Sequence, residues 1–232
     1  MHMRFLFLFL AAALMATPSV FRPGDVPPAW RPWGPVDLTT TPTWVMSWKL
    51  RELAGNEPAC LAAMAFAGAR LRDLPDRPTL NGCGIPGRVR LTGLAGAGLS
   101  PVETRCEIAA RLYLWERNTL QPAAQRYLGA SVARLDHYSS YSCRPIRTSR
   151  GNGRRMSQHA TANAIDISGF VLSDGRRITL LRDWDGSGPE AAFLRASRDG
   201  LCDWFNMVLS PDYNGLHADH FHADMGFWRG CR

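Results

Sequence analysis

The chain has 232 residues, of which 46% are hydrophobic and 20% charged, so it is long enough to bury the core of a globular domain. Its net charge of +7 at pH 7 favours anionic partners, although the charge is explained equally well as an aid to solubility. The basic residues are scattered and match no nucleic-acid-binding module, so no nucleic-acid partner is expected.

The N-terminal residues predict export. Residues 5–16 form an unbroken apolar run behind Arg4. A run of this length is shorter than a typical membrane-spanning helix and is typical of a signal peptide. We expect residues 1–20 to be a signal peptide or an uncleaved membrane anchor. The rest of the chain is then expected in the periplasm or cell envelope.

A proline-rich stretch follows. Residues 21–43 contain many prolines and little hydrophobic periodicity, which predicts an extended linker. We expect the folded domain to cover residues 44–232.

Helices are predicted at three places in this domain. The first covers 57–70, with Asn56 as its N-cap. The other two start at Ser100, reaching about Leu120, and at Ser187. Each of these two starts shows a Ser-x-x-Glu capping pattern with a proline in the first turn.

Short strands are predicted between the helices. The candidates are residues 87–92, 131–136, 163–171, 177–182 and 219–225. The segment Ser173-Asp174-Gly175 joins two of them and is a hairpin signal. This order of elements predicts an α+β domain, with a small, mainly antiparallel sheet and helices on one face.

Cysteine usage agrees with export. The chain has an even number of cysteines, and no two are close enough to form a zinc-binding CxxC pair. Behind an export signal this predicts up to three disulfides, with the pairing left open. The candidates are Cys60, Cys83, Cys106, Cys143, Cys202 and Cys231.

Two segments carry candidate metal ligands. Asp166 alternates with Ile165 and Ile167, so its carboxylate points away from the apolar face of the predicted strand. Such a carboxylate is costly unless it is paired or bound to a metal. His159 lies in the preceding loop, which can fold back toward Asp166.

The second segment is rich in histidine. His220 and His222 share one face of a predicted strand. If these two imidazoles lie close to His159 and Asp166, the four side chains make a plausible transition-metal site. Nitrogen and oxygen ligands without a thiolate suit Zn²⁺, and three protein ligands leave a fourth position for water. The alternatives are a polar network in a stable core, and a second histidine that only orients a ligand.

The pattern resembles known families. His159-x6-Asp166 with His220-x-His222 resembles the zinc peptidases of the lysostaphin, D-Ala-D-Ala metallopeptidase and hedgehog superfamily, and the region from His217 is especially similar to the penicillin-insensitive murein endopeptidases. From about Cys60 to its end the chain resembles the bacterial extensin-like C-terminal domain family. The segments that carry this second resemblance are 83–86, 140–144, 159–166 and 211–214.

The resemblance implies a hedgehog/D-Ala-D-Ala-peptidase-like fold and a role for each matching residue. The implied zinc ligands are His159, Asp166 and His222, with His220 as the catalytic base. The residues expected to line or support the site are Ser157, His217 and Asp219. Arg144 matches an arginine that holds a substrate carboxylate or the developing oxyanion, although a surface arginine beside a cysteine is an equally good interpretation. The base position holds no glutamate, which favours the endopeptidase-like branch.

The expected function is therefore zinc-dependent hydrolysis of an amide bond in a cell-wall (peptidoglycan) peptide by an exported enzyme. The alternative is a zinc-containing module that binds the cell wall without cleaving it. A serine hydrolase is disfavoured because the chain has no Gly-x-Ser-x-Gly motif.

Overall fold

The computed structural model describes residues 24–148 and 151–232. The predicted signal peptide or anchor, residues 1–20, lies outside them. Within the described ranges, no helix combines the length and apolar character that a membrane crossing requires.

The domain is built on a nine-stranded sheet, with the order β1-β4-β5-β6-β9-β12-β11-β13 and β10 paired with β9. Neighbouring strands are antiparallel except for β5 with β6 and β11 with β13. The bounds are β1 Arg70–Asp73, β4 Arg88–Gly93, β5 Gly98–Arg105, β6 Val132–His137, β9 Ala164–Leu172, β10 Arg177–Thr179, β11 Met207–Leu209, β12 Phe221–Asp224 and β13 Gly230–Cys231. The predicted α+β class is correct, but the sheet is larger than the small one expected.

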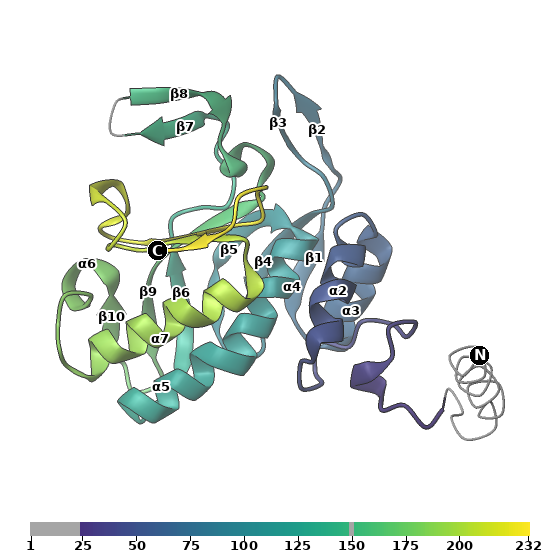
Figure 1. The fold of residues 1–232 in the computed structure, drawn as a ribbon, viewed down its shortest axis with the longest axis horizontal. Helices are drawn as coiled ribbons and strands as arrows, with labels where there is room; N and C mark the ends of the chain where they lie inside the picture. Colours follow the sequence, from purple (N-terminus) through teal and green to yellow (C-terminus); the bar gives the residue numbers. More distant parts are fainter. Residues whose placement is uncertain (1–23, 149–150) are drawn as a thin grey trace, which may run out of the picture.

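Helices cover one face of this sheet. They are α2 Trp44–Leu53, α3 Glu57–Phe66, α4 Cys106–Trp115, α5 Gln121–Leu128, α6 Leu180–Asp183 and α7 Pro189–Trp204. Figure 1 shows α4, α5 and α7 side by side against the sheet. The aromatic rings of Trp115 on α4 and Phe193 on α7 both pack on Phe170 of β9, with centroids 6.2 and 5.2 Å away. This buried aromatic contact joins the helix layer to the sheet.

Two smaller hairpins project from the side of the sheet away from α5 and α7, at the top of Figure 1. One consists of β2 Arg77–Leu80 and β3 Cys83–Ile85. The other consists of β7 Pro145–Thr148 and β8 Gly151–Met156.

The predicted helix from Ser100 is wrong over residues 100–105. Ser100 lies in β5, and helix α4 starts only at Cys106. Strand β5 pairs with β4 along its length and buries Val102 and Thr104, so long-range pairing outweighs the local capping pattern. The helix also continues past Leu120, where it was predicted to end, through a π-helical turn at Glu116–Leu120 into α5.

Other boundaries also differ from prediction. The side chain of Ser187 does not cap α7, whose N-cap is Gly188. The predicted strand 177–182 ends at Thr179, because a carboxylate oxygen of Asp183 accepts a hydrogen bond from the backbone N–H of Thr179 at 2.8 Å and starts α6. Helix α3 ends at Phe66, two residues before Gly68 with its φ of +74°.

Other local predictions are confirmed. The Asn56 side chain accepts a hydrogen bond from the backbone N–H of Ala59 at 3.2 Å and caps α3. Strands β9 and β10 form the antiparallel hairpin expected around Ser173-Asp174-Gly175.

The end of the proline-rich stretch packs on the domain. Leu38 is fully buried in the core. The Lys49 ammonium donates to the Pro35 carbonyl oxygen at 3.0 Å, and Arg117 donates to that of Thr39 at 2.6 Å. Contacts with the domain therefore begin ahead of Trp44, where the folded domain was predicted to start.

All six cysteines form disulfides, as predicted. Cys60–Cys106 joins α3 to α4, and Cys202–Cys231 joins α7 to β13 at the sheet edge. Cys83–Cys143 links the β2–β3 hairpin to the loop before β7. Each bridge therefore connects elements that are distant in the sequence.

Candidate metal centre

The centre lies where β9 and β12 pair near the middle of the sheet. His222 on β12 lies directly opposite Asp166 on β9, so their side chains share one face. Ile165 and Ile167, which alternate with Asp166, are buried in the core. The carboxylate and the imidazole therefore lie on the face away from the core, as the alternation predicts.

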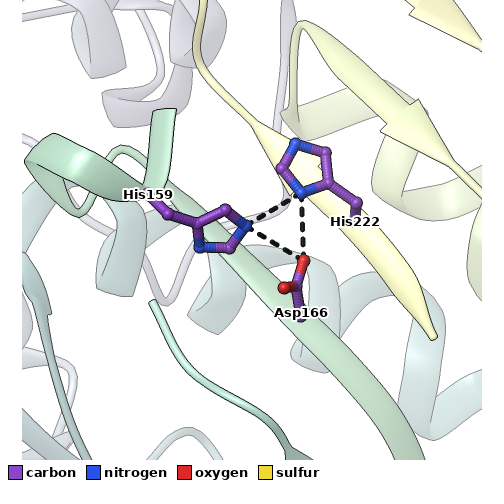
Figure 2. Close-up of side chains that lie close together, drawn as sticks. All are labelled: His159, Asp166 and His222. Carbon is purple, nitrogen blue, oxygen red and sulfur yellow. Dashed lines mark hydrogen bonds and ion pairs between the residues drawn. The ribbon is translucent and has the colours of Figure 1, made fainter. Parts of the chain in front are cut away.

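His159 reaches this face from the turn that precedes β9. The turn is a 3-10 helix, Gln158–Thr161, and the Ser157 side chain accepts a hydrogen bond from the backbone N–H of His159 at 3.3 Å. Ala162, with a φ of +50°, ends the turn in a left-handed conformation. The chain thus folds back and points His159 at Asp166 (Figure 2).

Three side-chain atoms converge at this point (Figure 2). Nε2 of His159 lies 3.1 Å from both Nδ1 of His222 and Oδ1 of Asp166, and the last two atoms are 3.0 Å apart. A tetrahedral ion with ligands at roughly 2.0–2.1 Å would place them about 3.3 Å from one another. The three atoms therefore have nearly the spacing of ligands around one metal ion.

Outer contacts fix which ring nitrogens face the cluster. Nδ1 of His159 lies 3.1 Å from the Ser140 carbonyl oxygen, and Nε2 of His222 lies 2.9 Å from a carboxylate oxygen of Asp224. These oxygens accept, so those two nitrogens carry the protons. The other nitrogens then direct lone pairs at the Asp166 carboxylate. Three converging acceptors require a shared proton or a cation, and this arrangement of outer partners is usual around metal-bound histidine.

The electrostatics of the pocket favour positive charge. Burial alone would lower the pKa of His222, but its hydrogen bonds to Asp166 and Asp224 raise the pKa to about 9. Burial alone would raise the pKa of Asp166, but His159 and His222 hold it well below its usual range. Without a metal, these groups hold a proton between them. The negative charge that stabilises this proton would also stabilise a divalent cation.

His220 lies next to this cluster. Its Nδ1 is 2.7 Å from a carboxylate oxygen of Asp219, and its Nε2 is 3.7 Å from Oδ1 of Asp166. The Tyr138 hydroxyl donates to the other oxygen of Asp219 at 2.7 Å. Burial and this hydrogen bond raise the pKa of Tyr138 to about 12, so the hydroxyl remains a donor. With Nδ1–H donated to Asp219, Nε2 of His220 is left as a proton acceptor on the side of the cluster.

His217 lines the same region from the 3-10 turn Gly215–His217. Its ring centroid lies 5.3 Å from that of His220 and 6.0 Å from that of His222. Burial, followed by repulsion from these two rings, lowers the pKa of His217 to about 4, so the ring is neutral near pH 7. It therefore provides an uncharged wall beside the two histidines.

The remaining predicted residues are placed differently. Ser157 stabilises the turn that carries His159 by accepting a hydrogen bond from the backbone N–H of His159. The Arg144 guanidinium donates to the Pro145 carbonyl oxygen at 3.3 Å. Among the contacts of the described residues, none joins Arg144 to the histidines or to Asp166, so its role toward substrate stays a prediction.

Ser140 contributes a contact that sequence reasoning missed. Its carbonyl oxygen orients His159, while its hydroxyl bonds the Thr104 hydroxyl at 2.7 Å and the Ala164 carbonyl oxygen at 2.6 Å. A backbone carbonyl leaves no signature of residue type, so the sequence held no signal for this role. Asp224 did carry a signal, because it is two residues from His222 on the same strand face.

Comparison with known proteins identifies one family. The family described as "Extensin-like protein C-terminus" matches residues 58–232, which include every residue of the cluster. No curated protein and no solved structure matches the chain.

Proposed function

The chain belongs to the family of the extensin-like protein C-terminus, and we propose that this member is an exported zinc-dependent peptidase that hydrolyses an amide bond in peptidoglycan peptides. The observation that carries the proposal is the convergence of three ligand atoms beside a third imidazole, that of His220, which has its own carboxylate partner. The resemblance to zinc peptidases assigns roles to these same residues.

In this proposal His159, Asp166 and His222 hold the zinc. The donor set fits zinc because it combines two imidazole nitrogens with one carboxylate oxygen and no thiolate. When bound, zinc would supply Lewis-acid activation of the scissile carbonyl and of water near neutral pH. Asp224 and the Ser140 carbonyl oxygen keep the two imidazoles in the tautomers that ligation needs.

The proton transfers fall to His220. Its Nε2 accepts a proton from the attacking water and then passes it to the leaving amine. Asp219 holds the Nδ1–H and stabilises the imidazolium that forms between these two steps. Tyr138 keeps Asp219 in place.

Three features support the cell wall as the location of the substrate. The disulfides suit an oxidising compartment outside the cytoplasm. The predicted export segment agrees with this, and it would tether the domain to the membrane if it is not cleaved. The net positive charge favours an anionic polymer over a neutral one.

The decisive experiment incubates the zinc-loaded protein with purified peptidoglycan and identifies the fragments by mass spectrometry. We expect new peptide ends from one type of amide bond, and release of these fragments that is slower by orders of magnitude with the His220→Ala variant. Zinc-loaded protein that binds peptidoglycan without cutting it would instead favour a non-catalytic binding module. Protein that holds no zinc after purification without chelator would contradict both.

A further inference from the structure

A cavity that shares no residue with the metal centre lies between α2, α4, the end of α7 and the edge strand β13. Its volume is about 540 Å³, within the range of small-molecule sites. Three arginines line it, together with Asp203, Trp204 and Phe205. None of the residues of the metal cluster lines this cavity.

Arg111 is the buried member of this group, with 6% of its surface exposed. Its Nη1 donates at 2.7 Å to the carbonyl oxygen of Trp204, the last residue of α7, and its Nε is buried without a partner. A guanidinium has five N–H donors. Within the part of the chain that the structure describes, one of the five is satisfied by a protein group. Buried donors left unpaired are costly, so a further acceptor is expected.

The charge around the cavity is also unbalanced. Arg51 and Arg229 line it as exposed residues, and neither of them nor Arg111 forms an ion pair with a described carboxylate. Glu107 attracts Arg111 electrostatically, but its ion pair is with Arg105 at 3.5 Å. Asp203 is the one acidic residue of the lining, against three arginines.

We infer that this cavity binds a small organic molecule through a carboxylate or phosphate group, with Arg111 as the inner anchor and Arg51 and Arg229 at the outer side. The planar guanidinium fork pairs with two oxygens of such a group at once. Trp204 and Phe205 offer an apolar wall for the body of the ligand. The inference is independent of the proposed peptidase activity, because the two sites share no residue.

Calorimetric titration of the purified protein at low salt tests this site. The probes are phenyl phosphate and phenylacetate, each compared with its small counterpart, inorganic phosphate or acetate. We expect saturable binding at one site per chain, with the phenyl compounds tighter because of the apolar wall. The stronger of the two series identifies the anionic group that the site selects.

Variants then assign the binding to the arginines. Arg51→Ala and Arg229→Ala are each expected to weaken it roughly tenfold, the usual scale for one charged hydrogen-bond partner. Arg111→Lys keeps the charge but loses the fork, so it should weaken binding at least as much. Arg177→Ala is the matched control, because it removes an exposed arginine from outside the cavity.

Three results would overturn the inference. One is the absence of binding by every probe. Another is equal binding by the wild type and by the Arg51→Ala and Arg229→Ala variants. These two variants test the inference even if Arg111→Lys does not fold. The third is loss of binding in Asp166→Ala, which disables the metal centre alone, because the anion would then be bound to the metal.

Discussion

At the scale of single residues, the metal centre depends on one carboxylate oxygen. Oδ1 of Asp166 lies 3.0 Å from Nδ1 of His222 and 3.1 Å from Nε2 of His159, so it is shared by both imidazoles. Its partner on β12 is fixed by strand register. Removal of the negative charge of Asp166 should therefore lower the zinc affinity more than the free energy of unfolding.

Asp166→Asn tests this expectation. The amide keeps the volume but loses the negative charge, so zinc content should fall from near one per chain to near zero. The loss of affinity should exceed the roughly 10–100-fold that removal of an outer partner costs. Metal analysis and chelator competition measure it, with the exposed Asp174→Asn as control. Wild-type affinity in Asp166→Asn would direct attention to Asp224 or Asp219 as the ligand.

The two neighbouring histidines should separate by role. His220→Ala should still bind zinc but lose roughly 10²–10⁴-fold in turnover on peptidoglycan, because a positioned base is gone. His222→Ala should lose the zinc itself. Metal content and turnover of the two variants are compared side by side. If the His220→Ala variant contains no zinc and the His222→Ala variant retains it, the two roles are exchanged.

Zinc affinity should depend on pH through His222. Its pKa of about 9 in the metal-free protein means that the ring is protonated at pH 7. Ligation requires the neutral ring, so zinc displaces a proton and binds more tightly as the pH rises toward 9. Calorimetry in buffers of different ionisation enthalpy should detect the released proton. Affinity that stays constant between pH 6 and 8 would contradict this assignment.

At the scale of elements, Glu116 joins the helix layer to the β4–β5 connection. It lies fully buried in the π-helical turn between α4 and α5. Its carboxylate accepts hydrogen bonds from the backbone N–H groups of Ala95 at 2.6 Å, Gly96 at 3.0 Å and Ala97 at 2.8 Å. Three donors on one turn require both carboxylate oxygens.

Glu116→Gln should therefore destabilise the protein. The amide keeps one acceptor oxygen, and its NH₂ group meets backbone donors that it cannot pair with. Each buried donor left without a partner costs about 1–3 kcal/mol in the free energy of unfolding. Urea denaturation of the metal-loaded protein measures the loss. Glu52→Gln, an exposed residue on α2, serves as the matched control and should be close to neutral.

At the largest scale, the three disulfides join peripheral elements of the fold that are far apart in the sequence. Cys202–Cys231 closes 29 residues and holds the edge strand β13 on α7. Cys60–Cys106 and Cys83–Cys143 close 46 and 60 residues. Asp166 and His222 of the metal cluster lie on the central strands β9 and β12, whereas the turn that carries His159 packs against β3, beside the Cys83–Cys143 bridge.

Thiol labelling tests the oxidised state. Exported protein, denatured without reductant, should show no free thiol among the six cysteines. Cys202→Ala/Cys231→Ala should lower the free energy of unfolding by about 2–4 kcal/mol yet keep its zinc, because the bridge mainly restricts the unfolded chain. Thermal denaturation and metal analysis measure both effects. Reactive thiols in most positions would contradict both the disulfides and the export prediction.

Features that depend on near neighbours in the chain can be predicted from the sequence. The Asn56 cap, the hairpin at residues 173–175 and the alternation around Asp166 each involve residues a few positions apart. Their energies depend on local backbone geometry, which spacing reveals. The spacing of His159, Asp166 and His222, together with the family resemblance, also predicts these three residues as one set.

Features that depend on residues far apart in the chain become visible only in the tertiary structure. The register that places His222 opposite Asp166, the Ser140 carbonyl oxygen on His159 and the pairing of the cysteines all join residues far apart in the chain. The segment at Ser100 shows why such features escape prediction: its capping pattern favours a helix, but pairing with β4 makes it a strand. Long-range pairing and burial outweigh local preferences of about 1 kcal/mol, and local sequence does not reveal them.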